Sequence, residues 1–331
     1  MKIVYMGTPD FAVPPLKALV AAGHDVALAV TKADRPKDRG KKMQSCPVKL
    51  AALELGVPVE SPEKVKGNVE LFERLRAIAP DFIVVAAYGK ILPKEVLDAP
   101  RFGCVNIHAS LLPLYRGAAP IHRAVIDGQE RTGVTIMCME EGLDTGAMLA
   151  QESVEIGTKT TEQLHEELAE LGARMIVDAL PGIASGEIKP VPQDDALATY
   201  APMVFKEEGV IDFSKTARQI CCLVRGFNSW PTASTTFGGQ VMKVHMAVEG
   251  KSAEGADGAA SDGAAVPENS AEGAAAPAFG TVLKADKHGI EVACKGGSVL
   301  LTRIQMPGKK AMDVSAWLLG NKIEPGTVLG Q

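Results

Sequence analysis

The sequence has few cysteines and no long apolar run. Its six cysteines among 331 residues show neither paired metal-type spacing nor the density of a disulfide framework, so we expect reduced thiols. No stretch is long and apolar enough to cross a membrane, and the first residues lack the apolar core of a secretory signal. These absences exclude a secreted disulfide scaffold and an integral membrane protein, and they predict a cytoplasmic one.

The chain also lacks a strong excess of charge. It has 35 basic and 40 acidic residues, for a net charge of −5. One segment, residues 249–278, carries the whole of this charge, with six acidic residues and one lysine. It consists almost entirely of Ala, Gly, Ser, Asp and Glu, a composition that cannot bury enough apolar surface to fold. We therefore expect a disordered insert at 249–278 in an otherwise neutral chain.

The first half alternates short apolar runs with amphipathic stretches, the pattern of β-α-β units around a parallel sheet. Gly23 and Gly56 each follow a predicted helix and are expected to cap it. Thr160 and Gln163 fit a capping box at the start of a helix over 161–179. The strands are predicted at 2–7, 25–32, 57–61, 81–89 and 103–108, and the helices at 12–22, 47–55, 68–78 and 118–127. This pattern predicts an α/β, Rossmann-like domain over 1–189.

A second domain is expected after a linker at 190–206, which is rich in Pro, Asp, Ala and Tyr without clear periodicity. A helix capped by Ser214 is followed by short strands at 233–237, 240–248, 280–285, 288–294 and 298–305. Five short strands predict a small, OB-like β-barrel over 207–331.

Two polar side chains share one face of the strand at 103–108. The two-residue period of a strand directs Asn106 and His108 to one side and Val105 and Ile107 to the other. The pair lies at the carboxyl end of an inner strand, where open parallel sheets place their ligand crevice. A turn contact for the asparagine and a hydrogen-bonded core position for the histidine are the alternatives.

Asp144 lies in a loop between two strands, flanked by Gly142 and Gly146, which free the backbone to direct the carboxylate. A loop aspartate is also a common turn former. Asn106, His108 and Asp144 together would supply an oxyanion donor, a proton shuttle and an acid that orients it. Transfer of an acyl group to an amine needs these three parts, and no metal is implied because no ligand cluster accompanies them.

The chain contains two basic regions. Residues 32–42 hold six basic and two acidic residues, and the parts of the second domain at 203–248 and 279–331 hold 12 basic and 7 acidic ones. Basic loops are often merely solvated, yet two such regions together favour an RNA partner. The apolar run 110–120 directly after His108 could line a slot for a flat heterocycle or simply connect strand to helix. The turn after the first strand lacks GxGxxG, so no dinucleotide fingerprint is present.

Motifs along nearly the whole chain resemble the methionyl-tRNA formyltransferase family. They are GTPDF, DRPKDRGKK, SCPVK, CVNIHASLLPLYRGAAP, RTGVTIMCM, GLDTG and KEEGVIDFSKTARQICCLVRGFNSWP. The resemblance implies a Rossmann-like domain that binds 10-formyltetrahydrofolate as formyl donor and an OB-like domain that helps to hold initiator methionyl-tRNA. It implies neither a membrane nor an obligate protein partner. The acidic insert departs from the family and is expected to leave activity intact.

The resemblance also assigns site residues. The catalytic positions fall on Asn106, His108 and Asp144, and the folate-contacting tetrad falls on Ser110, Leu111, Leu112 and Pro113. The basic loop of the family matches 34–42, with Arg39 at its key arginine. The tRNA-binding candidates are Arg35, Lys37, Arg39, Lys41 and Lys42 in the loop, and Arg303, Lys309 and Lys310 in the second domain.

Three other functions remain compatible with these residues. A sugar-nucleotide or glycinamide ribonucleotide formyltransferase would share the trio without needing the basic loop. A formyltetrahydrofolate hydrolase would use water in place of the amine. A non-catalytic tRNA-binding protein of the same fold would have no need of an intact trio.

Overall fold

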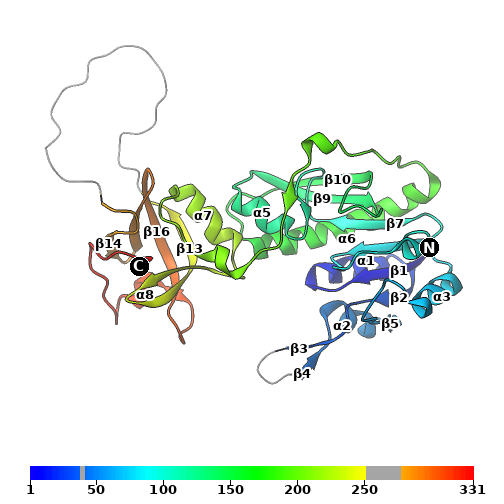
Figure 1. Ribbon diagram of the computed structural model, residues 1–331, viewed down its shortest axis with the longest axis horizontal. Coiled ribbons are helices and arrows are strands. Elements are labelled where there is room, and N and C mark those ends of the chain that lie inside the picture. The colour runs from blue at the N-terminus through cyan, green and yellow to red at the C-terminus, as the bar shows by residue number, and fades with distance from the viewer. Residues whose placement is uncertain (38–41, 251–276) are drawn as a thin grey trace, which may run out of the picture. The chain divides into compact units, whose positions relative to one another are not determined.

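The computed structural model describes residues 1–37, 42–250 and 277–331, and side chains at 35–43 are not described. The chain divides into two compact units. Unit 1 comprises Met1–Ala124 and Gln129–Met203, and unit 2 comprises Val125–Gly128 and Val204–Gln331. Each unit has its own sheet (Figure 1).

Unit 1 is built on a seven-stranded sheet of order β10-β9-β7-β6-β1-β2-β5. Neighbouring strands from β7 to β5 run parallel, and β9 and β10 are added antiparallel at one side. Its strands are β1 (Lys2–Gly7), β2 (Asp25–Val30), β5 (Val59–Glu60), β6 (Phe82–Ala86), β7 (Cys104–His108), β9 (Arg131–Cys138) and β10 (Met148–Glu155). The predicted parallel α/β sheet is confirmed.

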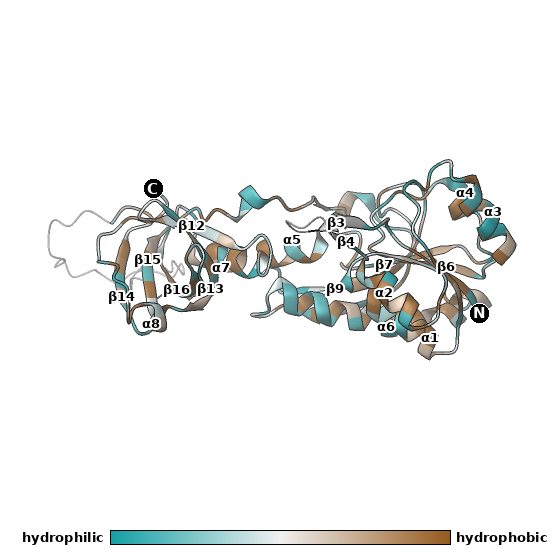
Figure 2. Ribbon diagram, turned by 90° about the horizontal axis from the view of Figure 1, so that it is seen from below, coloured by the Kyte–Doolittle hydropathy of each residue, from teal (hydrophilic) through white to brown (hydrophobic). Residues whose placement is uncertain are grey.

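Helices pack on this sheet through apolar faces, and Figure 2 shows both hydrophilic and hydrophobic residues along α3 and α6. The capping box at Thr160 and Gln163 starts α6, and Gly23 and Gly56 take positive φ angles just after α1 and α2, as predicted. The helices of this unit are α1 (Val13–Ala21), α2 (Pro47–Glu54), α3 (Val69–Ile78), α4 (Lys94–Leu97) and α6 (Thr161–Ser185), while α5 (Pro120–Ile126) leads from unit 1 into unit 2.

Unit 2 contains an antiparallel sheet of order β12-β13-β16-β15-β14, with β17 paired to β16. Val282 donates its N–H to the carbonyl of Thr327, and Gly330 donates to that of Thr236 in β12. The last residues therefore join the two outer strands, which gives the sheet a barrel-like closure. The strands are β12 (Ala233–Phe237), β13 (Gln240–Glu249), β14 (Val282–Asp286), β15 (Gly289–Cys294), β16 (Gly297–Gln305) and β17 (Met312–Asp313).

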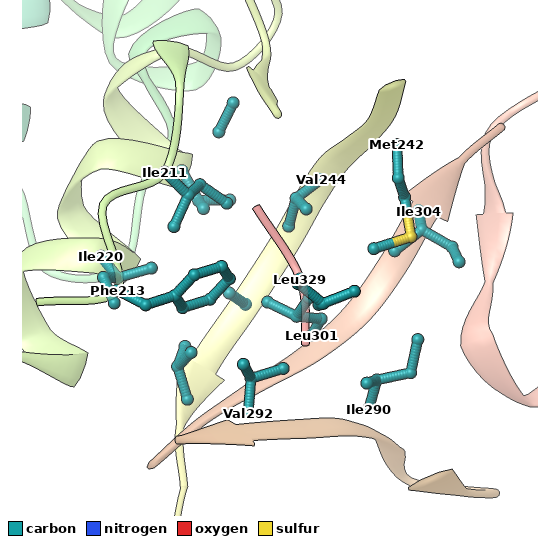
Figure 3. Packing of buried hydrophobic residues seen from close by; sticks show 14 of the residues in the cluster. Ile211, Phe213, Ile220, Met242, Val244, Ile290, Val292, Leu301, Ile304 and Leu329 are labelled. Atoms are coloured by element: carbon teal, nitrogen blue, oxygen red, sulfur yellow. The ribbon is translucent and has the colours of Figure 1, made fainter. Parts of the chain in front are cut away.

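One apolar cluster fills unit 2. Side chains from the sheet converge on those of Phe213 and of Ile220 in α7 (Ala217–Gly226), and Leu329 near the chain's end adds to them (Figure 3). The short helix α8 (Val314–Trp317) contributes two further buried residues. This shared core holds the short strands of unit 2 together as one unit.

Two sequence expectations differ from the structure or fall outside it. The helix α7 is capped by Thr216, whose side chain accepts from the N–H of Gln219, so Ser214 was the wrong cap. Most of the insert expected at 249–278 lies outside the described residues. The short strands β3 (Arg35–Lys37) and β4 (Lys42–Gln44) pair antiparallel on either side of 38–41, which are likewise outside them.

The segment expected as a linker at 190–206 has contacts within unit 1 as far as Met203. Val191 forms a bridge with Met148, and β11 (Tyr200–Ala201) pairs with β8 (Arg116–Gly117). Residues 190–203 therefore pack against the sheet edge and the loop after β7. The limits of the functional domains stay a prediction.

Candidate active site

The strand β7 places Asn106 and His108 on one face at the carboxyl end of the parallel sheet. His108 is 5% exposed, whereas Asn106 is only half-buried. Val105 and Ile107, on the other face, are buried in the core, as the alternation predicted. The polar pair therefore shares one surface, and only the asparagine is appreciably open to solvent.

Asp144 reaches the same place from the loop between β9 and β10. Its backbone adopts the left-handed conformation, with φ of 53°, which an aspartate tolerates better than most residues. Its Oδ2 lies 3.7 Å from His108 Nδ1, and the two side chains are 16% and 6% exposed. This separation suits an ion pair but is longer than a hydrogen bond.

A three-residue stretch, Tyr115 to Gly117, bridges the histidine and the aspartate. Tyr115 has a φ of 60° and presents its carbonyl to His108 Nε2 at 3.0 Å. Gly117 donates its N–H to Asp144 Oδ2 at 2.8 Å. A carbonyl only accepts, so Nε2 carries the proton and Nδ1 faces the carboxylate. The main chain therefore fixes the tautomer of His108, whereas the sequence pointed only to Asp144 as the group that orients it.

The loop that follows His108 is held by two polar side chains of the antiparallel strands. Thr135 donates to the carbonyl of Ser110 at 2.6 Å and accepts from the N–H of Leu112 at 3.1 Å. Gln151 donates to both the carbonyl of Leu112 and the hydroxyl of Thr135, each at 2.9 Å. These four hydrogen bonds fix the loop that carries the predicted folate contacts.

The four residues expected to contact folate differ in accessibility. Ser110 is fully buried and donates its hydroxyl to the carbonyl of Leu114 at 2.6 Å, and Leu112 is 3% exposed. Leu111 and Pro113 are half-buried. Leu111 and Pro113 are therefore the accessible members of the predicted tetrad, while Ser110 and Leu112 are buried inside the loop.

Two residues beside this site were not assigned from the sequence. Arg116, 2% exposed, donates to Gln193 Oε1 at 3.0 Å and to Asp195 Oδ1 at 2.7 Å. Gln193 donates in turn to the carbonyls of Asp144 and Gly146, at 2.8 and 2.7 Å. Arg116 belongs to a motif that carried the family resemblance, but nothing in the composition of 190–206 singles out Gln193.

The predicted tRNA-binding residues fall into two groups. Arg35, Lys37 and Lys42 lie on the β3–β4 pair, whereas Arg39 and Lys41 lie outside the described residues. In unit 2, Lys309 and Lys310 are exposed, and Arg303 pairs with Asp313 at 3.0 Å. Arg303 would have to leave Asp313 to contact a phosphate, whereas the side chains of Lys309 and Lys310 are exposed to solvent.

Among the residues that the structure describes, no group of three or more His, Cys, Asp or Glu side chains is arranged to hold a metal ion. Within the same part of the chain, no helix is long and apolar enough to cross a membrane.

The sheet with its added antiparallel strands, and the Asn-His-Asp group beside it, can be compared with known families of protein. Residues 1–180 match the family model for formyl transferases, and residues 203–322 match that for the formyl transferase C-terminal domain. The chain therefore belongs to the formyl transferases, and it carries both the transferase domain and the C-terminal domain of that family.

Its relatives narrow this class. It is 46% identical over 331 residues to the methionyl-tRNA formyltransferase of Moorella thermoacetica, covering 100% of this chain and 99% of that protein. It is 43% identical to that of Citrifermentans bemidjiense, covering 100% and 97%. The chain belongs to the methionyl-tRNA formyltransferase family.

Solved structures share the fold at lower sequence identity. An N-formyltransferase from Helicobacter canadensis, in complex with folinic acid and dTDP-3-aminofucose, is 16% identical with a TM-score of 0.63, covering 92% of this chain and 99% of that one. HypX from Aquifex aeolicus, in complex with tetrahydrofolic acid, is 18% identical with a TM-score of 0.60. That match covers 99% of this chain but only 50% of HypX.

Proposed function

We propose that this chain transfers the formyl group of 10-formyltetrahydrofolate to the amino group of methionine on initiator methionyl-tRNA. The observation that carries the proposal is the bridge from Tyr115 to Gly117, which holds His108 and Asp144 side by side at the carboxyl end of β7. Family membership supplies the donor and the acceptor.

The reaction is an acyl transfer in which the amine itself attacks. The amine nitrogen forms a bond to the formyl carbon, the bond from that carbon to N10 of the folate breaks, and the proton lost by the amine is delivered to N10. His108 Nδ1 accepts this proton from the amine and passes it on, because Nε2 is engaged by the carbonyl of Tyr115. The carboxylate of Asp144, 3.7 Å away, stabilises the imidazolium that forms in between.

Asn106 acts on the formyl oxygen. Its half-buried position on the same face of β7 lets its amide donate to the oxyanion that develops when the amine attacks. Leu111 and Pro113 would hold the folate ring against the loop after His108. Because all these groups lie on a sheet and on loops tied to it, the site is organised before substrates bind.

The basic residues of both units are assigned to tRNA binding. The β3–β4 pair brings Arg35, Lys37 and Lys42 onto one short element, and Lys309 and Lys310 lie exposed on unit 2. Charges of this kind contribute salt-dependent binding to phosphates and little base selectivity. We also place the enzyme in the cytoplasm, since its six cysteines are free thiols.

Formyl transfer should be measured with the purified chain, 10-formyltetrahydrofolate and one acceptor at a time. The proposal predicts N-formylmethionine on initiator tRNA. Parallel reactions contain a nucleotide-linked amino sugar, glycinamide ribonucleotide, or water alone. Formylation of either small acceptor with none of methionyl-tRNA, or hydrolysis of the donor alone, would contradict the proposal.

A further inference from the structure

The side-chain amide of Gln193 has one possible orientation. Arg116 has only donors, so it must face the amide oxygen, and the carbonyls of Asp144 and Gly146 only accept, so they must face the amide nitrogen. One amide therefore satisfies three partners at 2.7 to 3.0 Å. A glutamine can do this because its amide offers a donor and an acceptor at the end of one side chain.

The two carbonyls belong to the turn that directs the catalytic carboxylate. Asp144 is in the left-handed conformation, which costs about 1–3 kcal/mol for a non-glycine residue unless its surroundings hold it. Gly146 is buried, and a methyl group there would overlap the carbonyl of Cys138. The turn is thus constrained by the close approach of Cys138 to Gly146 and by the hydrogen bonds from Gln193 to the carbonyls of Asp144 and Gly146.

Arg116 links this contact to the other half of the site. It is nearly fully buried, and it lies between Tyr115, whose carbonyl accepts from His108, and Gly117, whose N–H donates to Asp144. Its Nε–H holds the oxygen of Gln193. A continuous path of hydrogen bonds therefore connects the backbone of Asp144 with the segment that fixes His108.

We infer that Gln193 is a positioning residue for formyl transfer. It holds the Asp144 turn so that the carboxylate stays beside His108 Nδ1. Arg116 in turn holds Gln193. This inference rests on the proposed catalytic role of Asp144. It assigns a part in the reaction to 190–203, a segment whose composition is that of a linker.

The test compares Gln193→Glu and Gln193→Met with the full-length wild-type chain. Glutamate keeps the shape and the contact with Arg116 but turns a carboxylate oxygen toward two carbonyls. Methionine keeps the length and removes both polar contacts. Because misplacing a catalytic group by about 1 Å costs on the order of 100-fold, kcat should fall ~10- to 100-fold in both variants. The KM values for donor and tRNA should stay within about 2-fold, because the amide groups of Gln193 are already engaged by Arg116 and by the two carbonyls.

A control separates positioning from general stability. Gln163→Ala removes half of the capping box of α6, which lowers Tm without touching the site. If Gln193→Glu lowers kcat no more than Gln163→Ala does, the inference is wrong. A rise in KM with kcat unchanged would also overturn it, since that pattern indicates lost binding.

A double-mutant cycle with Asp144→Asn decides whether the effect passes through Asp144. Single-turnover rates should show that Gln193→Glu slows the Asp144→Asn enzyme by less than ~3-fold, because residues that act as a unit are not additive. If the rate loss of the double variant equals the product of the two single losses, Gln193 does not act through Asp144, while the role of Asp144 stands. A wild-type rate for Asp144→Asn alone would instead refute the catalytic role of Asp144, and the inference with it.

Discussion

At the scale of single residues, the site depends on backbone groups as much as on side chains. The carbonyl of Tyr115 selects the tautomer of His108, and the N–H of Gly117 holds Asp144. Asn106, His108 and Asp144 could be recognised from strand period and from motif. Tyr115 could not, because its contribution is a carbonyl directed by a φ of 60° that no residue type encodes.

Gly117→Ala should abolish most activity. Gly117 has a φ of 118°, and a methyl group there would lie 2.9 Å from the carbonyl of Ala201 in β11, so the strained chain must move and carry its N–H away from Asp144. We expect kcat to fall ~100-fold, as for a misplaced catalytic group, measured by single turnover. Gly320→Ala is the control, because a methyl group there meets no neighbour. Equal activity of the two variants would contradict the account.

At the scale of elements, the position of β7 depends on how closely α6 packs beneath it. Gly172 of α6 lies under Ile107, which alternates with Asn106 and His108 along the strand. The sequence predicted both elements, since continuous apolar strands and a capping box are local signals. It did not predict the role of Gly172, because close approach between distant segments leaves no local pattern.

Gly172→Ala should destabilise the protein. The added methyl group would lie 2.6 Å from Ile107 Cγ2, on a branched side chain that cannot swing away. Overpacking costs about 1–3 kcal/mol, whereas the gain in helix propensity is roughly 1 kcal/mol, so we expect a lower Tm in thermal unfolding. Ile107→Ala combined with Gly172→Ala should cost less than the sum of the two changes. Full additivity would mean that the two residues do not touch.

At the scale of the whole molecule, charge is distributed unevenly along the chain. The residues assigned to tRNA lie in the basic loop at 32–42 and in unit 2, while the 249–278 segment, with six acidic residues and one lysine, accounts for the net negative charge of the chain. Composition alone indicated this division. The identity of the RNA came from the family, because a count of charges carries no information on which RNA is bound.

Arg39→Ala should weaken use of tRNA more than use of folate. Loss of a phosphate contact lowers affinity and reduces the salt slope by about 1, so KM for tRNA should rise ~10-fold, equivalent to about 1.4 kcal/mol. KM for the folate should stay within about 2-fold under this electrostatic account. Lys66→Ala, an exposed lysine elsewhere on unit 1, is the matched control. An equal rise in KM for tRNA and for the folate would contradict a role of this loop in tRNA binding.

Neutralising the acidic insert should leave catalysis intact. Replacing its five acidic residues between 251 and 276 by their amides removes like charge that polyanionic tRNA would avoid. We expect kcat to change less than ~2-fold, since charge that repels the tRNA acts on encounter and not on the chemical step. Steady-state rates at low and moderate salt test this. A large fall in kcat would give the insert a direct role.

The central claim is that Asn106, His108 and Asp144 carry out formyl transfer to methionyl-tRNA, and single-turnover transfer from 10-formyltetrahydrofolate tests it most directly. The account predicts N-formylmethionyl-tRNA with the wild-type chain and a loss of ~100-fold or more with His108→Ala and with Asp144→Ala, as expected when acid–base catalysis is removed. Wild-type rates in either variant, with the fold intact by thermal unfolding, would contradict it.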